Sequence, residues 1–532
     1  MSRAPMSLRS AVLLSLGMVC FSGLVSPTAQ GPADWPMAGQ NLSNTRAQPA
    51  EDLLGPGNVP ALRPKWVFTT GDDVSATPAV ADEAVYVPDW AGNLFKINAS
   101  TGAGVWAHQL SEYTGTAPTI SRTTPALGDG RLYLGTLAGA YLLAIDSTTG
   151  GLIWKTQLSA HPGALITQSP VVFQQRVYVG VSSKEEIMAL VLPHYQCCTF
   201  RGSVVALDAP SGRIVWQSYT TPDNGGRAGG YAGNAVWGST PVVDALRNAL
   251  YITTGNNYNV PAWVKACEAA RRANPTLPSC VSSENYVDAI VALDLDTGAV
   301  KWSNKLQGYD AWNFACVGLR HRPNCPEPTG PDFDFGQGPM LFTVVQEGHA
   351  RQLLGAGQKS GIFWALDPET GAVVWSTVVG PSGGLGGIMW GSATEASRVY
   401  VAVANSAHQT YTLVPSGEQT QGGAWSALDA ATGTIIWQTA VPLGNLALGP
   451  VSVANGVVYG GSMAESGENM FALDGASGAI LWGYASGGSV NAGPAVVHGM
   501  VYWGSGYAHF GQGSGNNQLY AFGLAAGGEA RR

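Results

Sequence analysis

Residues 294–302 read DLDTGAVKW, and the same pattern occurs seven times in a chain of 532 residues. In every copy an Asp or Asn stands eight residues before a Trp, and a Gly stands four residues before it. The Gly allows the positive φ of a tight turn, and the Asp side chain accepts hydrogen bonds from turn amides. The pattern predicts a β-hairpin that ends in Trp, which we call the Asp-to-Trp repeat. Its copies end at Trp106, Trp154, Trp216, Trp302, Trp375, Trp437 and Trp482.

The segments before each repeat also resemble strands. An apolar stretch such as 290–293 (IVAL) precedes the turn directly, and a second stretch such as 176–180 (RVYVG) is typical of the strand before it. The composition agrees, since 70 Gly, 17 Trp and only 12% charged residues are typical of short strands joined by turns. Repeated units of this kind predict an all-β fold, a β-propeller of four-stranded blades. The repeated Trp side chains are expected to pack between blades.

The two ends of the chain complete one further blade. Trp66 has no Asp-x-x-Thr-Gly turn before it, and the strand-like segment 519–524 (LYAFGL) has no Trp after it. Each end holds the half that the other lacks, so joining them closes the ring and removes exposed sheet edges. We therefore predict eight blades within residues 34–525, closed by the N- and C-terminal strands.

The first 29 residues have the pattern of an export signal. A short apolar run follows Arg3 and Arg9, and it is too short to span a bilayer as a membrane helix. A lipoprotein anchor at Cys20 is the alternative. The sequence predicts a periplasmic or secreted protein with no transmembrane anchor and a disordered tail at 526–532.

Cysteine usage fits an oxidising compartment. Six cysteines remain after Cys20, in three close groups, and we expect local pairing. Cys197 and Cys198 are adjacent, and they pair either with each other or with two separate partners. The groups are Cys197 with Cys198, Cys267 with Cys280, and Cys316 with Cys325.

Charge excludes some classes of partner. The net charge is −8, and no run of Lys or Arg is present to follow a phosphate backbone, so we expect no nucleic-acid partner. No Cys-x-x-Cys-His motif occurs, so the chain carries no site for covalently attached haem.

Polar segments interrupt the repeat in the middle of the chain. They are SSKEE at 182–186, the region 235–259, YDAWN at 309–313 and GQKSG at 357–361. Because loops carry most binding and catalytic residues, we expect these segments to meet at one end of the central channel. A nearby insertion at 260–280 is predicted to contain a short helix.

The repeat and the opening segment 34–49 (DWPMAGQNLSNTRAQP) resemble the pyrroloquinoline quinone (PQQ) dependent alcohol dehydrogenases. The resemblance extends from Asp34 to the C-terminus. Residues 195–209 (YQCCTFRGSVVALDA) are similar, more narrowly, to the polyvinyl alcohol dehydrogenase branch. The resemblance implies PQQ and calcium as cofactors, an alcohol as substrate, and a separate electron acceptor such as a cytochrome c.

The resemblance also implies roles for polar residues. Glu185 matches a calcium ligand of the family, with Glu186 as the alternative, and Asn256 matches a second ligand through its amide oxygen. These are hard oxygen donors of the kind that calcium prefers. Asp310 matches the catalytic base and is also expected at the metal, although Asn313 replaces an acid of the family pattern.

The remaining assignments concern the quinone. Trp237 matches a ring that stacks on it, Lys359 a cation that hydrogen-bonds it, and Trp390 a neighbouring ring. In the family, two adjacent cysteines that cover the quinone lie in an earlier segment of the chain. Cys197 and Cys198 occur later, so a cover that they form over the quinone would come from a different loop.

Bland interpretations remain for each of these residues. In these alternative explanations the Glu is a solvated surface charge, and the Asn and the Asp stabilise turns. The Lys then forms a surface ion pair, and the Trp packs between blades. Met389 also departs from the family, which often has Asn there. A non-catalytic scaffold that binds a protein or cell-envelope ligand is the alternative function, and a sugar dehydrogenase is a third.

Overall fold

The computed structural model describes residues 1–2, 33–192, 194–318 and 322–525. The predicted export signal and C-terminal tail lie almost entirely outside these residues. Within them, no helix is both long and apolar enough to cross a membrane.

The described chain forms eight antiparallel β-sheets of four or five strands, each of them one blade of a propeller, and two small two-stranded sheets. In blades one to seven the four main strands follow one another along the chain, from the first to the fourth strand of the blade. Blades one to four comprise β2 (Ala79–Ala81), β3 (Ala84–Pro88), β4 (Asn93–Asn98) and β5 (Gly104–Gln109); β6 (Ala126–Gly128), β7 (Arg131–Gly135), β8 (Tyr141–Asp146) and β9 (Leu152–Gln157); β11 (Val171–Phe173), β12 (Arg176–Ser183), β13 (Ser203–Asp208) and β14 (Ile214–Tyr219), with β10 (Ala164–Leu165) added to β12; and β16 (Val242–Asp244), β17 (Ala249–Thr253), β19 (Ala289–Asp294) and β20 (Val300–Lys305). Blades five to eight comprise β21 (Met340–Gln346), β22 (His349–Gly357), β23 (Ile362–Leu366) and β24 (Val373–Val378); β25 (Ala393–Glu395), β26 (Arg398–Val403), β29 (Ala424–Asp429) and β30 (Ile435–Ala440); β31 (Ser452–Ala454), β32 (Val457–Gly461), β33 (Met470–Asp474) and β34 (Ile480–Tyr484); and β35 (Ala495–Val497), β36 (Met500–Ser505), β37 (Gln518–Leu524) and β1 (Leu62–Thr69).

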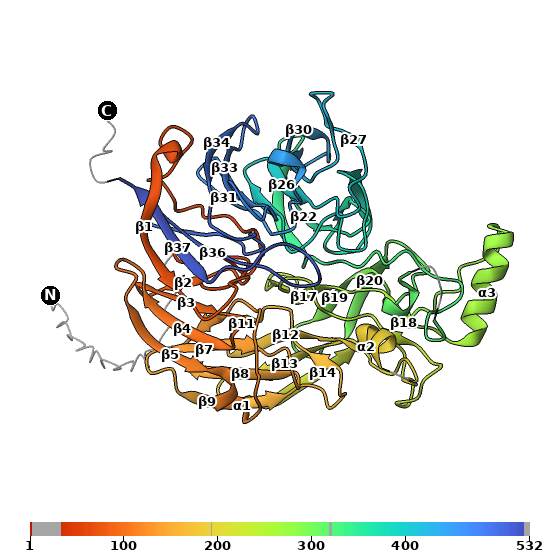
Figure 1. The fold of residues 1–532 in the computed structure, drawn as a ribbon. Helices are drawn as coiled ribbons and strands as arrows, with labels where there is room; N and C mark the ends of the chain where they lie inside the picture. The colour runs from red at the N-terminus through yellow and green to blue at the C-terminus, as the bar shows by residue number, and fades with distance from the viewer. Residues whose placement is uncertain (3–32, 193, 319–321, 526–532) are drawn as a thin grey trace.

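The eighth blade joins the two ends of the chain, as predicted. Strand β1 pairs antiparallel with β37, with Leu62 opposite Leu524 and Thr69 opposite Gln518. Figure 1 shows the red N-terminal strand lying beside the blue C-terminal one. This pairing closes the ring, and the predicted eight-bladed propeller is confirmed.

The turn of each Asp-to-Trp repeat is held by its Asp side chain. In the second blade, Asp146 Oδ1 accepts hydrogen bonds from the amides of Thr148 (3.0 Å) and Thr149 (2.7 Å) and from the Thr149 hydroxyl (2.9 Å). These bonds lower the pKa of Asp146, chiefly through the Thr149 amide and hydroxyl. The same side-chain contacts recur at Asp294, so the repeat is a local structural unit.

The Gly and the Trp of the repeat join neighbouring blades. Gly298 has a φ of +71°, and a Cβ placed there would lie 2.5 Å from the ring of Trp216 in the preceding blade. The indole Nε1 of Trp216 donates to the carbonyl of Leu295 at 3.0 Å. Six of the seven repeat Trp residues donate in this way to the next blade, namely Trp154, Trp216, Trp302, Trp375, Trp437 and Trp482. The predicted packing role is confirmed for them.

The connections between strands alternate between two faces of the ring, because neighbouring strands are antiparallel. The turn of the repeat joins the third and fourth strands, and it shares one face with the turn between the first and second strands. We call this the turn face. The opposite face carries the connection from the second to the third strand and the passage into the next blade, and we call it the loop face.

Nearly all of the additional elements lie on the loop face. They are α1 (Leu110–Thr114), α2 (Glu185–Val191), α3 (Ala262–Ala273), η2 (Phe314–Cys316), η3 (Pro442–Gly444), the pair β15 (Ala232–Gly233) with β18 (Asn257–Asn259), and the pair β27 (Tyr411–Thr412) with β28 (Gln419–Thr420), whereas η1 (Val59–Ala61) precedes β1. The predicted helix within 260–280 is therefore confirmed as α3, which stands at the edge of the molecule in Figure 1. The cysteines form the three local disulfides, Cys197–Cys198, Cys267–Cys280 and Cys316–Cys325.

Candidate active site

A cavity of about 360 Å³ opens on the loop face. Apart from Ser182 and Ser183 at the end of β12, the residues that line it come from second-to-third-strand loops or from passages between blades. Among the residues singled out from the sequence, the lining includes Glu186, Trp237, Lys359, Met389 and Trp390. It does not include Glu185, Cys197, Cys198, Asn256 or Asp310.

A buried lysine lies between two buried aspartates in this cavity. Lys359 Nζ is 2.9 Å from Asp332 Oδ1 and 3.4 Å from Asp334 Oδ2. Burial alone would lower the pKa of Lys359, but Asp332, Asp334 and Glu186 together raise it, so the lysine stays protonated. The pKa of Asp332 is raised well above its ordinary value, chiefly by burial.

The two acids differ in how their oxygens are used. Asp334 accepts hydrogen bonds from the backbone amide of Asn256 and from Trp237 Nε1 (3.0 Å) in addition to Lys359. Among the described residues Lys359 is the one side chain that hydrogen-bonds the Asp332 carboxylate, and Asp332 lines the cavity. Asp334 therefore orients Trp237, whereas Asp332 offers a carboxylate oxygen to a ligand.

Aromatic side chains form one wall of the cavity. Trp237 and Trp390 pack edge to face with ring centroids 5.3 Å apart, and Lys359 Nζ lies 5.5 Å from the ring of Trp237. Trp390 has a φ of +46°, which is a strained conformation for a large side chain. Met389 is buried beside these rings. Such flat, apolar surfaces suit a planar aromatic ligand.

The adjacent residues Glu185 and Glu186 face different surroundings, because α2 begins at Glu185. Glu185 is fully buried away from the cavity, where Oε1 accepts from the Tyr195 hydroxyl (2.6 Å) and the Thr199 amide (2.8 Å), and Oε2 from the Phe200 amide (2.8 Å). These contacts leave little room for a cation. Glu186 instead lines the cavity, and burial followed by repulsion from Asp334 raises its pKa to about 8.

Asn256 lies directly behind the acidic cluster. Its side-chain nitrogen donates to the carbonyl of Trp312 at 2.9 Å, which orients the amide group. Its Oδ1 is buried and has no hydrogen-bond partner among the described residues. A buried carbonyl oxygen without a donor is unfavourable, and a bound cation would satisfy it.

Asp310 lies behind the cavity wall and supports it. Its carboxylate accepts from the amides of Asp332 (3.1 Å) and Phe333 (2.7 Å). Burial raises the pKa of Asp310 to about 6, and the fully buried Asp288 is its carboxyl neighbour. The YDAW segment therefore holds the loop that presents Asp332, and the geometry offers Asp332 in place of Asp310 for contact with a ligand.

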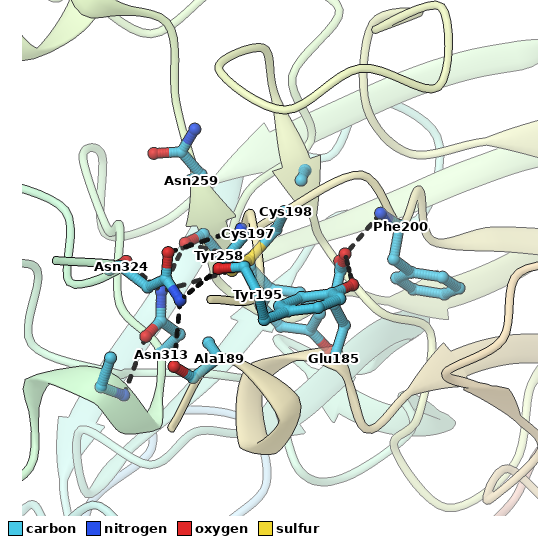
Figure 2. Close-up of a disulfide and its surroundings, with 12 residues drawn as sticks. Glu185, Ala189, Tyr195, Cys197, Cys198, Phe200, Tyr258, Asn259, Asn313 and Asn324 are labelled. Carbon is cyan, nitrogen blue, oxygen red and sulfur yellow. Dashed lines mark hydrogen bonds between the residues drawn. A yellow bond between two sulfur atoms is a disulfide. The ribbon is translucent and has the colours of Figure 1, made fainter. Parts of the chain in front are cut away.

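The disulfide between Cys197 and Cys198 sits in a loop that packs beside α2 and not in the cavity lining. Figure 2 shows this bond close to Glu185, Tyr258 and Asn313. Asn313 Nδ2 donates to the carbonyls of Tyr258 (3.0 Å) and Asn324 (2.8 Å). Asn313 thus cross-links this region, which explains an amide at a position where the family pattern has an acid.

The side chains around the cavity suit a quinone, but they do not form a complete metal site without a further ligand. Among the described residues, no three acidic, His or Cys side chains are arranged to hold a metal ion by themselves. Three acids, Glu186, Asp332 and Asp334, nevertheless surround Lys359, and Asn256 Oδ1 has no donor among the described residues. This excess of buried oxygen ligands fits a calcium ion whose coordination shell is completed by a second ligand.

Comparison with known proteins decides the family. The profile of the PQQ-type glucose/ethanol/alcohol dehydrogenase β-propeller domain matches residues 35–317. The polyvinylalcohol dehydrogenase of Sphingopyxis sp. (strain 113P3) is 32% identical over 94% of this chain and 76% of its own length. That of a Pseudomonas species is 30% identical over 90% of this chain and 74% of its own. The chain belongs to the PQQ-dependent alcohol dehydrogenase family. It is therefore an oxidoreductase, and the scaffold alternative is not supported.

Solved structures give the same fold for this alcohol dehydrogenase. The quinohemoprotein alcohol dehydrogenase of Comamonas testosteroni superimposes with a TM-score of 0.68 over 92% of this chain and 80% of its own, at 21% identity. BamB of Moraxella catarrhalis superimposes with a TM-score of 0.51 at 15% identity, and the profile of the outer membrane protein assembly factor BamB matches residues 421–529. At these identities the structures share the propeller alone.

Two features of the dehydrogenase cavity were missed in the sequence. Asp332 and Asp334 lie in the segment PDFDFG, 22 and 24 residues after Asp310, and its alternating acids were the available signal. Arg122 also lines the cavity, with its guanidinium 4.1 Å from the ring of Trp390. It lies in the segment TISRTT at 119–124, where a single Arg among small polar residues carries no signal of its own.

Proposed function

We propose that this alcohol dehydrogenase uses PQQ and calcium to oxidise an alcohol to a carbonyl compound in the loop-face cavity. The observation that carries the proposal is the placement of Lys359 between Asp332 and Asp334 beside Trp237. When bound, PQQ supplies the electrophilic carbonyl that takes up two electrons from the alcohol carbon, with calcium as a Lewis acid.

Asp332 is the proposed general base. It lines the cavity, and burial raises its pKa, which makes its carboxylate a stronger base than an exposed one. Asp310 holds the Asp332 and Phe333 amides, so it acts as a positioning residue. This assignment replaces the sequence-based expectation that Asp310 itself is the base and a metal ligand.

Glu186 and Asn256 are the proposed calcium ligands from the protein, together with the carboxylate of Asp332. Glu186 replaces Glu185 in this role because the oxygens of Glu185 already accept four hydrogen bonds from Tyr195, Thr199 and Phe200. Carboxylate and amide oxygens form the hard ligand set that calcium prefers. Calcium would also offset the burial and the repulsion from Asp334 that together raise the pKa of Glu186.

Four residues are proposed to hold the quinone. Trp237 and Trp390 offer flat faces, and Lys359 and Arg122 offer positive charge to an anionic planar ligand. Lys359 would also stabilise negative charge that gathers on the reduced quinone. Cys197 and Cys198 lie outside the lining, so a role for them as a cover over the cofactor depends on movement of their loop.

The substrate and the acceptor follow from the same chemistry. We infer a secondary or polymeric alcohol, such as the polyvinyl alcohol named for the relatives, since the cavity is open and largely apolar. The chain has no Cys-x-x-Cys-His motif, so electrons pass to a separate carrier such as a cytochrome c. A periplasmic or secreted location agrees with the three disulfides.

Reconstitution tests this function. Purified protein is titrated with PQQ in the presence of calcium, and quinone absorption and dye-linked turnover are followed over a panel of alcohols. Asp332→Asn is expected to retain PQQ binding and lose turnover, with His349→Leu on the exposed β21–β22 hairpin as the control. Absence of PQQ binding, or full turnover in Asp332→Asn, contradicts the proposal.

A further inference from the structure

The cavity has a second polar end on the side opposite the acidic cluster. The acids and Lys359 come from blades three to five and the passages between them, whereas Trp90 and His509 come from blades one and eight. In a closed ring of eight blades these two groups face each other across the axis. His509 lies in the loop between β36 and β37, a segment that the sequence analysis did not single out.

His509 is held in place by two neighbours. Its imidazole stacks on the indole of Trp90 with ring centroids 3.5 Å apart and an angle of 21° between the planes. Trp90 is fixed in turn, because its Nε1 donates to Ser75 Oγ at 2.8 Å. On the other side of His509, Nε2 lies 3.2 Å from Asp73 Oδ2.

Asp73 anchors the whole loop. It is almost fully buried, and its carboxylate accepts from the amide of Ala508 at 2.8 Å and from the amide of Asn516 at 2.8 Å. The loop is therefore tied down on both sides of His509, and His509 keeps about a quarter of its side chain exposed. A fixed, partly exposed polar ring inside a ligand cavity suits recognition of a ligand.

The charge state of His509 defines what it can bind. Its pKa is lowered by burial and by Arg122, and Asp73 offsets only part of this, so the ring is neutral at neutral pH. A neutral imidazole keeps a lone pair on one of its two ring nitrogens. Nε2 lies near Asp73 but makes no hydrogen bond with the described residues, so the ring is free to present its lone pair to a ligand.

The lining also includes aliphatic side chains. Leu137 and Leu165 come from blade two and the passage after it, and Leu448 comes from the passage between blades six and seven, so in ring order they lie between the blades that carry the two polar groups. A hydrocarbon segment fits this stretch, and a hydroxyl at its far end meets an acceptor at His509.

We propose that His509, held by Asp73 and Trp90, is a substrate-positioning residue that accepts a hydrogen bond from a second hydroxyl of the alcohol. The enzyme then prefers diols and polyols, whose hydroxyls are separated by an aliphatic segment, over monoalcohols of the same length. This inference rests on the proposed alcohol oxidation in the same cavity.

The test compares matched substrates on matched variants. kcat and KM are measured on the PQQ- and calcium-loaded enzyme with straight-chain monoalcohols and with diols of the same carbon number, across a series of chain lengths. Wild type is expected to favour at least one diol, and His509→Leu to lose about three- to tenfold of that preference through KM, the effect of one hydrogen bond.

Two further variants guard the interpretation. His509→Gln keeps an acceptor and is expected to restore part of the preference, while His349→Leu on the exposed hairpin keeps all of it. Equal losses for monoalcohols and diols in His509→Leu, or no diol preference in wild type, overturn the inference and leave the dehydrogenase function standing. Wild type that oxidises no alcohol at all overturns both.

Discussion

The turn face and the loop face of the propeller use the same strands for opposite purposes. On the turn face, Asp146 and Asp294 make the same hydrogen bonds in different blades. On the loop face, each connection has its own length and sequence, and those connections line the cavity. Repetition stabilises the ring, whereas chemistry requires side chains that occur once. A substitution on one face should therefore affect stability, and a substitution on the other should affect catalysis.

The largest expected effect is a loss of activity at Glu186, and it distinguishes this residue from its neighbour Glu185. Glu186→Gln should lower kcat/KM by about 10³-fold, equivalent to about 4 kcal/mol of barrier, because it removes the negative charge of the proposed calcium ligand from the cavity. Its unfolding midpoint should remain close to that of wild type. Steady-state kinetics at increasing calcium and thermal unfolding measure both quantities.

The matched variant is Glu185→Gln. It weakens a buried acceptor of four hydrogen bonds, so it should destabilise the fold while the rate per folded, cofactor-loaded molecule changes little. Loss of calcium-dependent turnover in Glu185→Gln, with full activity in Glu186→Gln, would return the ligand role to Glu185.

On the turn face, Trp216→Ala should lower the free energy of unfolding by about 3 kcal/mol. The substitution opens a hole between blades three and four and leaves the Leu295 carbonyl without its indole donor. Denaturant unfolding measures the loss. A large fall in kcat for the folded variant would contradict the separation of the two faces.

Gly298→Ala tests the same contact between blades three and four from the side of blade four. The positive φ and the short approach to Trp216 predict a loss of about 2 kcal/mol. Gly308 is the control, since it also has a positive φ but a Cβ there meets nothing within 4 Å, so Gly308→Ala should cost less. Equal losses at the two positions would assign the effect to φ alone.

The smallest effect is expected at one turn aspartate. Asp146→Ala should lower the free energy of unfolding by about 0.5 kcal/mol, because its hydrogen bonds lie at the solvent-exposed edge of one blade. Turnover should be unchanged. A precise denaturant titration resolves this loss, and a loss several times larger would show that a single turn controls the cooperativity of the ring.

Much of the cavity was predictable because its residues break a strict pattern. Trp237, Lys359 and Trp390 were singled out as departures or through family resemblance, and all three line the cavity. The choice between Glu185 and Glu186 was not predictable, because the start of α2 decides which side chain faces inward. Consecutive residues of a helix point in different directions, so Glu185 is buried behind the cavity whereas Glu186 lines it.

Asp332 and His509 show a second limit of the sequence. Asp332 follows Asp310 at a distance of 22 residues, and its place in the cavity depends on amide contacts to the Asp310 carboxylate. His509 reaches the cavity only because the ring closes and brings blade eight across from blade four. Neither relation has a local signal in the chain.

The sequence by itself determined the blade, the number of blades and the closure of the ring. These follow from turn geometry and from strand pairing within short segments, which depend on neighbouring residues. Only the tertiary structure decided which carboxylates face the cavity and which support it from behind. That choice depends on loops from distant blades packing around one axis, where burial and charge arise from residues far apart in the chain.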